Sequence, residues 1–185
     1  MLYAVSGSQG SGKSFTLDHL PYRKIVRKTS RSILADWNVT LSQVNNDREL
    51  TVRFQEEILK RKYDDECADV NTDEIVFTER TPMDLFVYAL VALGKDNEYS
   101  DWLNDYYTRC LNMSMDMYAG VFYLFPLKGM AIENDGVRAT NHHYSHLINS
   151  TLLWYTGKLT TTHLVATSDL GDRIELIQRA LNNHQ

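Results

Sequence analysis

The sequence predicts a three-layer α/β fold, in which helices cover both faces of a mostly parallel sheet of about five strands. Short apolar runs at 2–6, 74–78 and 120–125 suit buried parallel strands. Longer stretches with apolar residues at helical spacing separate these runs, and this alternation is typical of parallel sheets. Because no Pro- or Gly-rich linker divides the 185 residues, we expect a single domain over residues 1–185.

The first strand leads directly into a glycine-rich motif. Gly7, Gly12, Lys13 and Ser14 fit the pattern G-x-x-x-x-G-K-[ST], the phosphate-binding loop (P-loop) of nucleoside triphosphate hydrolases and kinases. The glycines let backbone N–H groups point at phosphate oxygens at the start of a helix. Lys13 is expected to reach the β- and γ-phosphates of ATP, and the Ser14 hydroxyl to bind Mg²⁺. The residues predicted to bind ATP are Gly7, Ser8, Gln9, Gly10, Ser11, Gly12, Lys13 and Ser14.

A basic cluster follows the first helix, which we expect at 15–20. The segment 22–31 contains Arg23, Lys24, Arg27, Lys28 and Arg31. A solvated surface is the favoured interpretation, and contact with DNA or with an acidic substrate through residues 23–31 is the alternative.

Residues 32–35 are predicted to form the second strand, which places Asp36 and Trp37 at its end. Ligands of doubly wound sheets bind beyond the carboxyl ends of the strands. Asp36 is therefore a candidate general base for an acceptor hydroxyl, although a helix cap is an equally good interpretation. Trp37 is a candidate to stack on the acceptor.

An amphipathic helix is predicted over 47–68, with charged residues covering the side opposite its apolar face. Gln55 lies among the apolar positions of this helix. It could read the base of a substrate from the cleft, and a peripheral polar residue is the alternative.

The apolar run at 74–78 ends in Glu79, Arg80 and Thr81. A carboxylate at this position can hold Mg²⁺ through water, and the guanidinium beside it can bind a phosphate or a hydroxyl. The alternative is a salt bridge at the end of a strand. Thr81 is expected to be the N-cap, and Pro82 the first turn, of a nearly all-apolar helix that continues over 83–93. Core packing is the favoured interpretation of Tyr88 in this helix, and a side chain that faces the pocket is the alternative.

The second half of the chain supplies two more helices and two more strands. A helix at 101–118 carries a stripe of Met and aromatic residues that suits a core or a homodimer interface. Strands are expected at 120–125 and 163–167, with a helix at 141–155 between them. Ser168 or Asp169 is expected to cap a last helix at 170–181, where Arg173 could stack on a purine.

The segment 128–145 resembles a mobile lid, because it is rich in turn-forming residues and carries Arg138. A closing lid would place this arginine against charge that develops on the transferred phosphoryl group. A surface loop is the alternative. His142, His143 and His146 are expected to lie on the surface or in the pocket, because a fourth metal ligand at suitable spacing is missing.

The composition excludes several classes of protein. A hydrophobic fraction of 43% is that of a globular chain, and the net charge of −5 argues against broad binding to nucleic acid. No apolar run approaches the ~20 residues of a membrane span, and a signal peptide is not expected. Cys67 and Cys110 are predicted to be free thiols in a reducing compartment, the cytoplasm.

These motifs resemble a family of small P-loop nucleoside and nucleotide kinases, similar to the nicotinamide riboside kinase type. The resemblance rests on the P-loop, on E-R-T-P-M-D at 79–84, on D-G-V-R at 135–138 and on the closing strand and helix. It implies phosphoryl transfer from ATP with Mg²⁺ to a nucleoside or (deoxy)nucleotide-like acceptor, with Glu79 at the metal, Arg80 at the acceptor and Arg138 in the lid.

Two alternatives to a kinase of small molecules stay open. Compact kinases of this kind also occur in bacteriophages, where acceptors include hydroxymethylated pyrimidines within DNA. The other alternative is a nucleotide-dependent switch or assembly ATPase, which transfers phosphate only to water.

Overall fold

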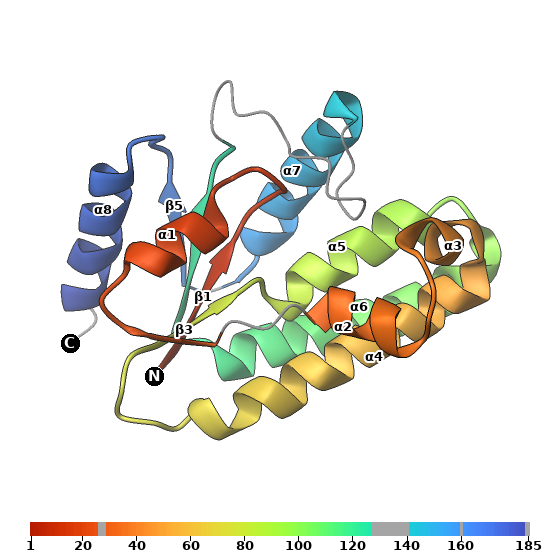
Figure 1. Ribbon diagram of the computed structural model, residues 1–185, viewed down its shortest axis with the longest axis horizontal. Helices are drawn as coiled ribbons and strands as arrows, with labels where there is room; N and C mark the ends of the chain where they lie inside the picture. Colours follow the sequence, from red (N-terminus) through yellow and green to blue (C-terminus); the bar gives the residue numbers. More distant parts are fainter. Residues whose placement is uncertain (26–28, 127–140, 160, 184–185) are drawn as a thin grey trace.

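The computed structural model describes residues 1–25, 29–126, 141–159 and 161–183. Its five strands are all parallel: β1 (Leu2–Ser6), β2 (Arg23–Ile25), β3 (Val76–Glu79), β4 (Gly120–Leu124) and β5 (Thr162–Val165). Their order in the sheet is β2-β3-β1-β4-β5 (Figure 1). The predicted α/β fold is confirmed, and β1 with its P-loop lies at the centre of the sheet.

Helices cover both faces of this sheet. They are α1 (Lys13–His19), α2 (Thr29–Asp36), α3 (Leu41–Asn46), α4 (Arg48–Glu66), α5 (Pro82–Leu93), α6 (Ser100–Met117), α7 (His142–Thr156) and α8 (Leu170–Asn182). Tyr3 and Val5 of β1 pack under α1 and α8, whereas Leu2 and Ala4 pack on the opposite face with the end of α6. This alternation follows from the two-residue period of a strand.

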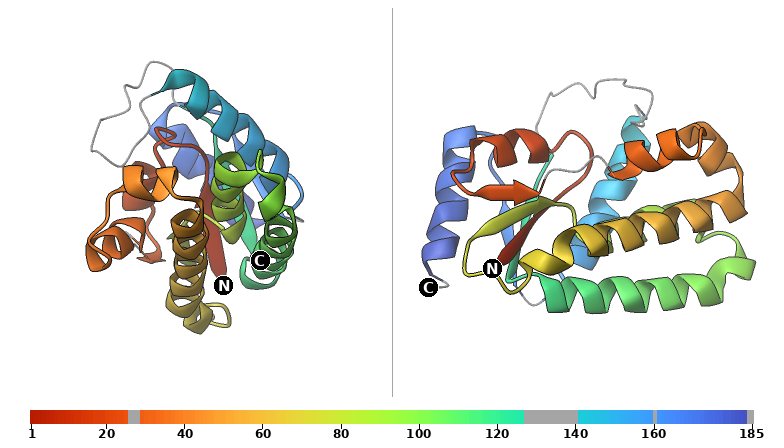
Figure 2. Two further views of the ribbon diagram at one scale, coloured as in Figure 1. Left: turned by 90° about the vertical axis from the view of Figure 1, so that its right-hand side faces the viewer. Right: turned by 60° about the horizontal axis from the view of Figure 1, so that its bottom comes forward.

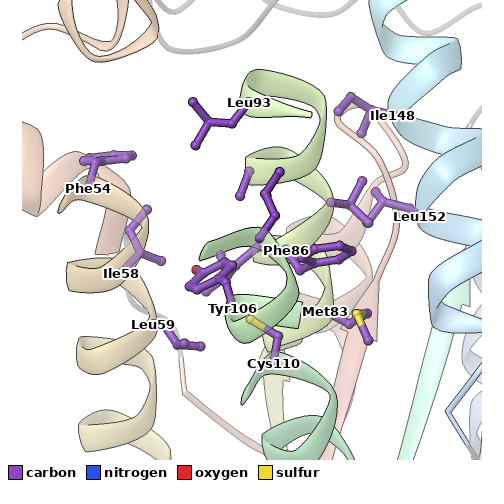
Figure 3. Close-up of a cluster of buried hydrophobic side chains, with 14 of the residues drawn as sticks. Phe54, Ile58, Leu59, Met83, Phe86, Leu93, Tyr106, Cys110, Ile148 and Leu152 are labelled. Atoms are coloured by element: carbon purple, nitrogen blue, oxygen red, sulfur yellow. The ribbon is translucent and has the colours of Figure 1, made fainter. Parts of the chain in front are cut away.

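The largest core lies among the helices, around α5. Met83 and Phe86 of α5 meet Tyr106 and Cys110 of α6, with side chains of α4 and α7 on either flank (Figure 3). Helices α4 and α6 run side by side (Figure 2), and Arg109 of α6 binds the Glu56 carboxylate of α4 at 2.8 Å. The nearly all-apolar sequence of α5 is thus explained, because helices surround it.

The prediction of a strand at 32–35 is wrong. These residues belong to α2, which buries Ile33 and Leu34 against the helical core. A run of four residues is too short for its period to distinguish helix from strand. The second strand is β2, inside the basic segment, where it pairs only with β3 at the edge of the sheet.

The other predicted elements are confirmed to within a few residues, and α3 is an addition. Its start at Thr40 has a capping box with Gln43, a signal that the sequence carries. Two of the charged residues of α4, Lys62 and Glu66, are buried. Within the described residues, no helix is both long and apolar enough to cross a membrane.

Candidate active site

The P-loop connects β1 to α1 and requires its glycines. Gly7, Gly10 and Gly12 have φ values of 141°, 76° and 80°, a backbone region that residues other than glycine rarely adopt. A Cβ atom at Gly7 would also lie 2.5 Å from the Leu124 carbonyl oxygen. Gly7 therefore allows the loop to pass close to the end of β4.

Lys13 begins α1 and points into the loop. Its Nζ donates to the carbonyl oxygens of Gly7 at 2.9 Å and Ser8 at 2.8 Å, and only 5% of the residue is exposed. An ammonium group held at the loop by backbone carbonyls is placed to exchange these partners for phosphate oxygens.

Ser14 and Glu79 join the P-loop to the end of β3. The Ser14 hydroxyl donates to Glu79 Oε2 at 2.7 Å, because the register of the sheet sets Glu79 beside Val5 of β1. Burial raises the pKa of Glu79, but the positive charges of Lys13 and Arg80 outweigh it, so that the pKa lies below its usual value. An ionised carboxylate and a hydroxyl in contact are oxygen ligands of the kind that Mg²⁺ takes, so the residues present fit this ion.

Arg80 follows Glu79 and has an unusual backbone. Its φ of 70° costs about 1–3 kcal/mol for a residue with a side chain. Its Nη1 donates to the Tyr88 hydroxyl at 3.3 Å and lies 3.9 Å from Asp84 Oδ1, while 26% of the side chain is exposed. Burial lowers the pKa of Arg80, but Tyr88 and Asp84 outweigh it and raise the pKa, so the guanidinium stays charged.

Asp84 is a residue that sequence reasoning missed as part of this site. It is fully buried, and Oδ1 accepts from the Ser6 hydroxyl at 3.0 Å while Oδ2 accepts from the Thr81 N–H at 2.8 Å. The confirmed cap at Thr81 is a capping box with Asp84 at its third position, which is the signal that could have revealed it. Asp84 thus links the end of β1 to the start of α5, beside Arg80.

Tyr88 packs against the helical core, which is the favoured interpretation of this residue, and it also lies beside Arg80. The Arg80 guanidinium lies 5.1 Å from the centre of the Tyr88 ring. Tyr144, at the start of α7, is a second aromatic residue here that sequence reasoning missed. Burial, together with Tyr88, raises the pKa of Tyr144 to about 12, with Arg80 opposing the shift. The Tyr88 hydroxyl of α5 therefore contacts the guanidinium, and Tyr144 of α7 lies close enough to interact with both electrostatically.

Gln55 and Trp37 lie on neighbouring elements, α4 and the end of α2. Gln55 is 7% exposed, and its Oε1 has no hydrogen-bond partner among the described residues. Trp37 meets Phe54 edge to face, with ring centres 6.2 Å apart, and Arg53 covers the Trp37 ring at 5.4 Å. A buried acceptor atom without a partner is unfavourable unless a ligand supplies one.

Asp36 occupies a different position from the one predicted. It is the last residue of α2 rather than the end of a strand, and its carboxylate accepts from Arg61 Nη1 at 2.7 Å. The alternative, a cap for the next segment, is also wrong, since Thr40 caps α3. Its role as a general base stays a prediction without the strand-end geometry that suggested it.

Arg173 binds the P-loop from the side of α8. Its Nη1 donates to the Ser11 carbonyl at 2.6 Å, its Nη2 to Phe125 at 3.0 Å and its Nε to Thr167 at 2.8 Å. Because the residue is 2% exposed, it offers no open face for a purine, and the structure does not support stacking. Arg173 instead ties together the turns that follow β1, β4 and β5.

Several predictions concern segments outside this cluster. Arg138, and most of the lid-like segment 128–145, lie outside the described residues. In the basic segment, Arg23 pairs with Asp69 and Glu74, and Lys24 pairs with Asp18, so these two cations are already neutralised. His142, His143 and His146 are exposed, and across 1–25, 29–126, 141–159 and 161–183 no group of residues is arranged to hold a metal by His, Cys, Asp and Glu ligands alone.

Comparison with known structures finds the same fold in solved kinase structures. A deoxyadenosine kinase from M. mycoides, solved with the products dCMP and a flexible dCDP, is 18% identical with a TM-score of 0.70, over 99% of this chain and 100% of that one. NadR in complex with NR is 17% identical with a TM-score of 0.74, over 99% of this chain and 51% of that one. The predicted resemblance to nucleoside and nucleotide kinases is thereby confirmed for the fold.

The comparison by sequence is sparser. No curated protein sequence gives a significant match. A family model described as an AAA domain matches residues 2–154, which include the P-loop, the E-R-T segment and most of α7. The chain therefore belongs to this family of AAA domains.

Proposed function

We propose that the protein transfers the γ-phosphoryl group of ATP to a hydroxyl or phosphate of a nucleoside or (deoxy)nucleotide-like acceptor, with Mg²⁺. The observation that carries this proposal is the contact of Ser14 with Glu79, with Arg80 next along the chain. A P-loop alone indicates a nucleoside triphosphate, whereas a charged guanidinium beside the predicted metal ligands suits phosphoryl transfer.

The donor side consists of the P-loop and the end of β3. Backbone N–H groups of the P-loop and the Lys13 ammonium would bind the phosphates of ATP. Ser14, directly, and Glu79, through water, would hold Mg²⁺, which neutralises charge on the phosphates when it is bound. The Glu79 carboxylate is ready for this role because its lowered pKa keeps it ionised at neutral pH.

Arg80 would act at the boundary between donor and acceptor. Phosphoryl transfer needs positioning and charge stabilisation more than covalent participation by the protein. The Arg80 guanidinium is charged, partly exposed and already oriented by Tyr88 and Asp84. Its orientation before the substrate arrives lowers the cost of stabilising charge in the transition state.

The acceptor would lie among α2, α4, α5 and α7. Gln55 offers an unpartnered amide oxygen, while Trp37 and Tyr88, both packed against the helical core, offer aromatic surface. Amides that form hydrogen bonds and aromatic rings that stack are the groups that recognise nucleobases. The similar solved structures include a deoxyadenosine kinase and NadR in complex with NR. This similarity supports a nucleoside as the first acceptor to test.

The test is transfer of label from [γ-³²P]ATP to a panel of acceptors. The panel contains nucleosides, nucleoside monophosphates, nicotinamide riboside, and DNA with or without hydroxymethylated pyrimidines. We expect label on a free nucleoside or nucleotide, and no label with the Glu79→Gln variant. Label only on DNA would favour the DNA-modifying alternative, and label only in inorganic phosphate would favour the ATPase alternative.

A further inference from the structure

Helix α4 buries an ion pair against strand β3. Lys62 Nζ and Glu66 Oε1 are 2.5 Å apart, and the two side chains are only 9% and 2% exposed. Desolvation makes buried ion pairs weak contributors to stability, since apolar residues in their place often serve as well or better. The location of this pair therefore calls for a second explanation.

The carboxylate of Glu66 is held from three directions. Besides Lys62, it accepts from the hydroxyl of Thr78 in β3 and from the hydroxyl of Tyr118 at 2.6 Å. Glu66 therefore holds the ammonium group of Lys62 in place. The same Nζ also donates to the carbonyl oxygen of Glu79 at 3.3 Å.

That carbonyl belongs to the peptide group between Glu79 and Arg80. The N–H of the same peptide group donates to the Val5 carbonyl of β1 at 2.8 Å. Both polar atoms of this one peptide group are thus held, by β1 on one side and by Lys62 of α4 on the other. The constraint coincides with the φ of 70° at Arg80, a backbone conformation that persists only when its surroundings enforce it.

We propose that Lys62 is a positioning residue for phosphoryl transfer, and this inference rests on the function proposed above. Its ammonium group, anchored by Glu66, fixes the Glu79–Arg80 peptide group. The carboxylate of Glu79 is thereby directed at Ser14, and the guanidinium of Arg80 at Tyr88. Lys62 touches neither ATP nor acceptor in this account, and acts through Glu79, which would hold Mg²⁺ through water, and through Arg80.

The experiment separates positioning from packing with matched variants. Lys62→Met alone would leave the Glu66 carboxylate buried without its cation and would destabilise the fold. The double variant Lys62→Met with Glu66→Gln removes both charges. The glutamine amide can still accept from one of the Thr78 and Tyr118 hydroxyls and donate to the oxygen of the other. Lys60→Met is the control, because Lys60 is exposed on the same helix.

We expect the double variant to melt near the temperature of the wild type while its kcat falls about tenfold or more, as misplacement of reacting groups causes. Calorimetry supplies a readout other than activity. In the wild type, Mg²⁺ should strengthen the binding of a non-hydrolysable ATP analogue, and in the double variant this gain should shrink while metal-free binding is unchanged. The single variant Lys62→Arg, which keeps a cation, should retain most of the wild-type kcat and most of the gain in binding from Mg²⁺.

A stable double variant with the kcat and the Mg²⁺ effect of the wild type would overturn the inference, because the pair would then serve packing alone. The calorimetric comparison stands even if the wild type phosphorylates no acceptor, an outcome that refutes only the proposed function. An Mg²⁺ effect that is absent in the wild type, or equal in both proteins, refutes the positioning role itself.

Discussion

The donor side and the acceptor side of the candidate site are built in different ways. On the donor side, the P-loop and the E-R-T segment are short continuous sequences, and adjacent parallel strands bring them together. Their polar groups are already paired, as Lys13 is with the Gly7 and Ser8 carbonyls. On the acceptor side, helices far apart in sequence contribute single residues, and the Gln55 amide oxygen lacks a partner in the part of the chain described.

This difference teaches where reaction and specificity are encoded. The class of reaction depends on local motifs whose geometry the sheet fixes. In the proposed function, the choice of acceptor would depend on how α2, α4, α5 and α7 pack, so a different acceptor would need no change in the motifs. The two sides should therefore respond differently to substitution.

The largest effect is expected on the donor side, from Lys13→Ala. Loss of the ammonium group removes the cation that faces the phosphates, so that turnover should fall by about 10³-fold or more and binding of ATP should weaken. Steady-state transfer and calorimetric titration with ATP measure both. Lys24→Ala, which breaks only an exposed pair with Asp18, is the control, and equal activity of the two variants would refute the assignment of the P-loop.

Arg80→Ala should lower kcat by about 10²-fold with a smaller change in the KM for ATP, because its guanidinium stabilises charge that develops during transfer. Kinetics at saturating ATP and acceptor give the split between the two constants. A variant that shows a raised KM for ATP with normal kcat would move Arg80 to a role in ground-state binding.

Gln55→Leu tests the acceptor side with two readouts, the melting temperature and the KM for the acceptor. Removal of a buried amide whose oxygen lacks a partner should leave the melting temperature unchanged or raise it. The KM for the acceptor should rise about tenfold or more, since the hydrogen bond to the base is lost. A fall in stability with an unchanged acceptor KM would assign Gln55 to the core.

The smallest effect is expected from Asp36→Asn. Its side chain is 55% exposed and bound to Arg61, so that its loss should change kcat by less than about threefold, as is usual for an exposed ion pair. The matched variant Glu57→Gln breaks the other pair of Arg61. A loss near the 10²-fold typical of a missing general base, confined to Asp36→Asn, would restore its role as the catalytic base.

The sequence predicted the donor side well because each of its signals is local. The spacing of Gly7, Gly12 and Lys13 indicates a P-loop without reference to other segments, and an apolar run that ends in Glu79 and Arg80 indicates a strand end. The cap at Thr81 was predicted for the same reason, and the structure confirms it.

Predictions failed where the outcome depended on distant contacts. The run that precedes Asp36 fits helix and strand equally, and only its packing against the helical core decides between them. The tie between Arg173 and Ser11 joins residues 162 positions apart, and no sequence pattern foretells it. Glu66, the buried partner of Lys62, likewise binds Thr78 and Tyr118, which come from other elements.

The central claim, that the site passes phosphate to an acceptor rather than to water, is tested most directly by stoichiometry. ADP and phosphorylated acceptor are measured in one reaction with [γ-³²P]ATP, with and without the nucleoside that the panel selects. The account predicts one ADP for each phosphorylated acceptor, and almost no ADP when the acceptor is absent. ADP that forms at the same rate with or without acceptor would contradict it.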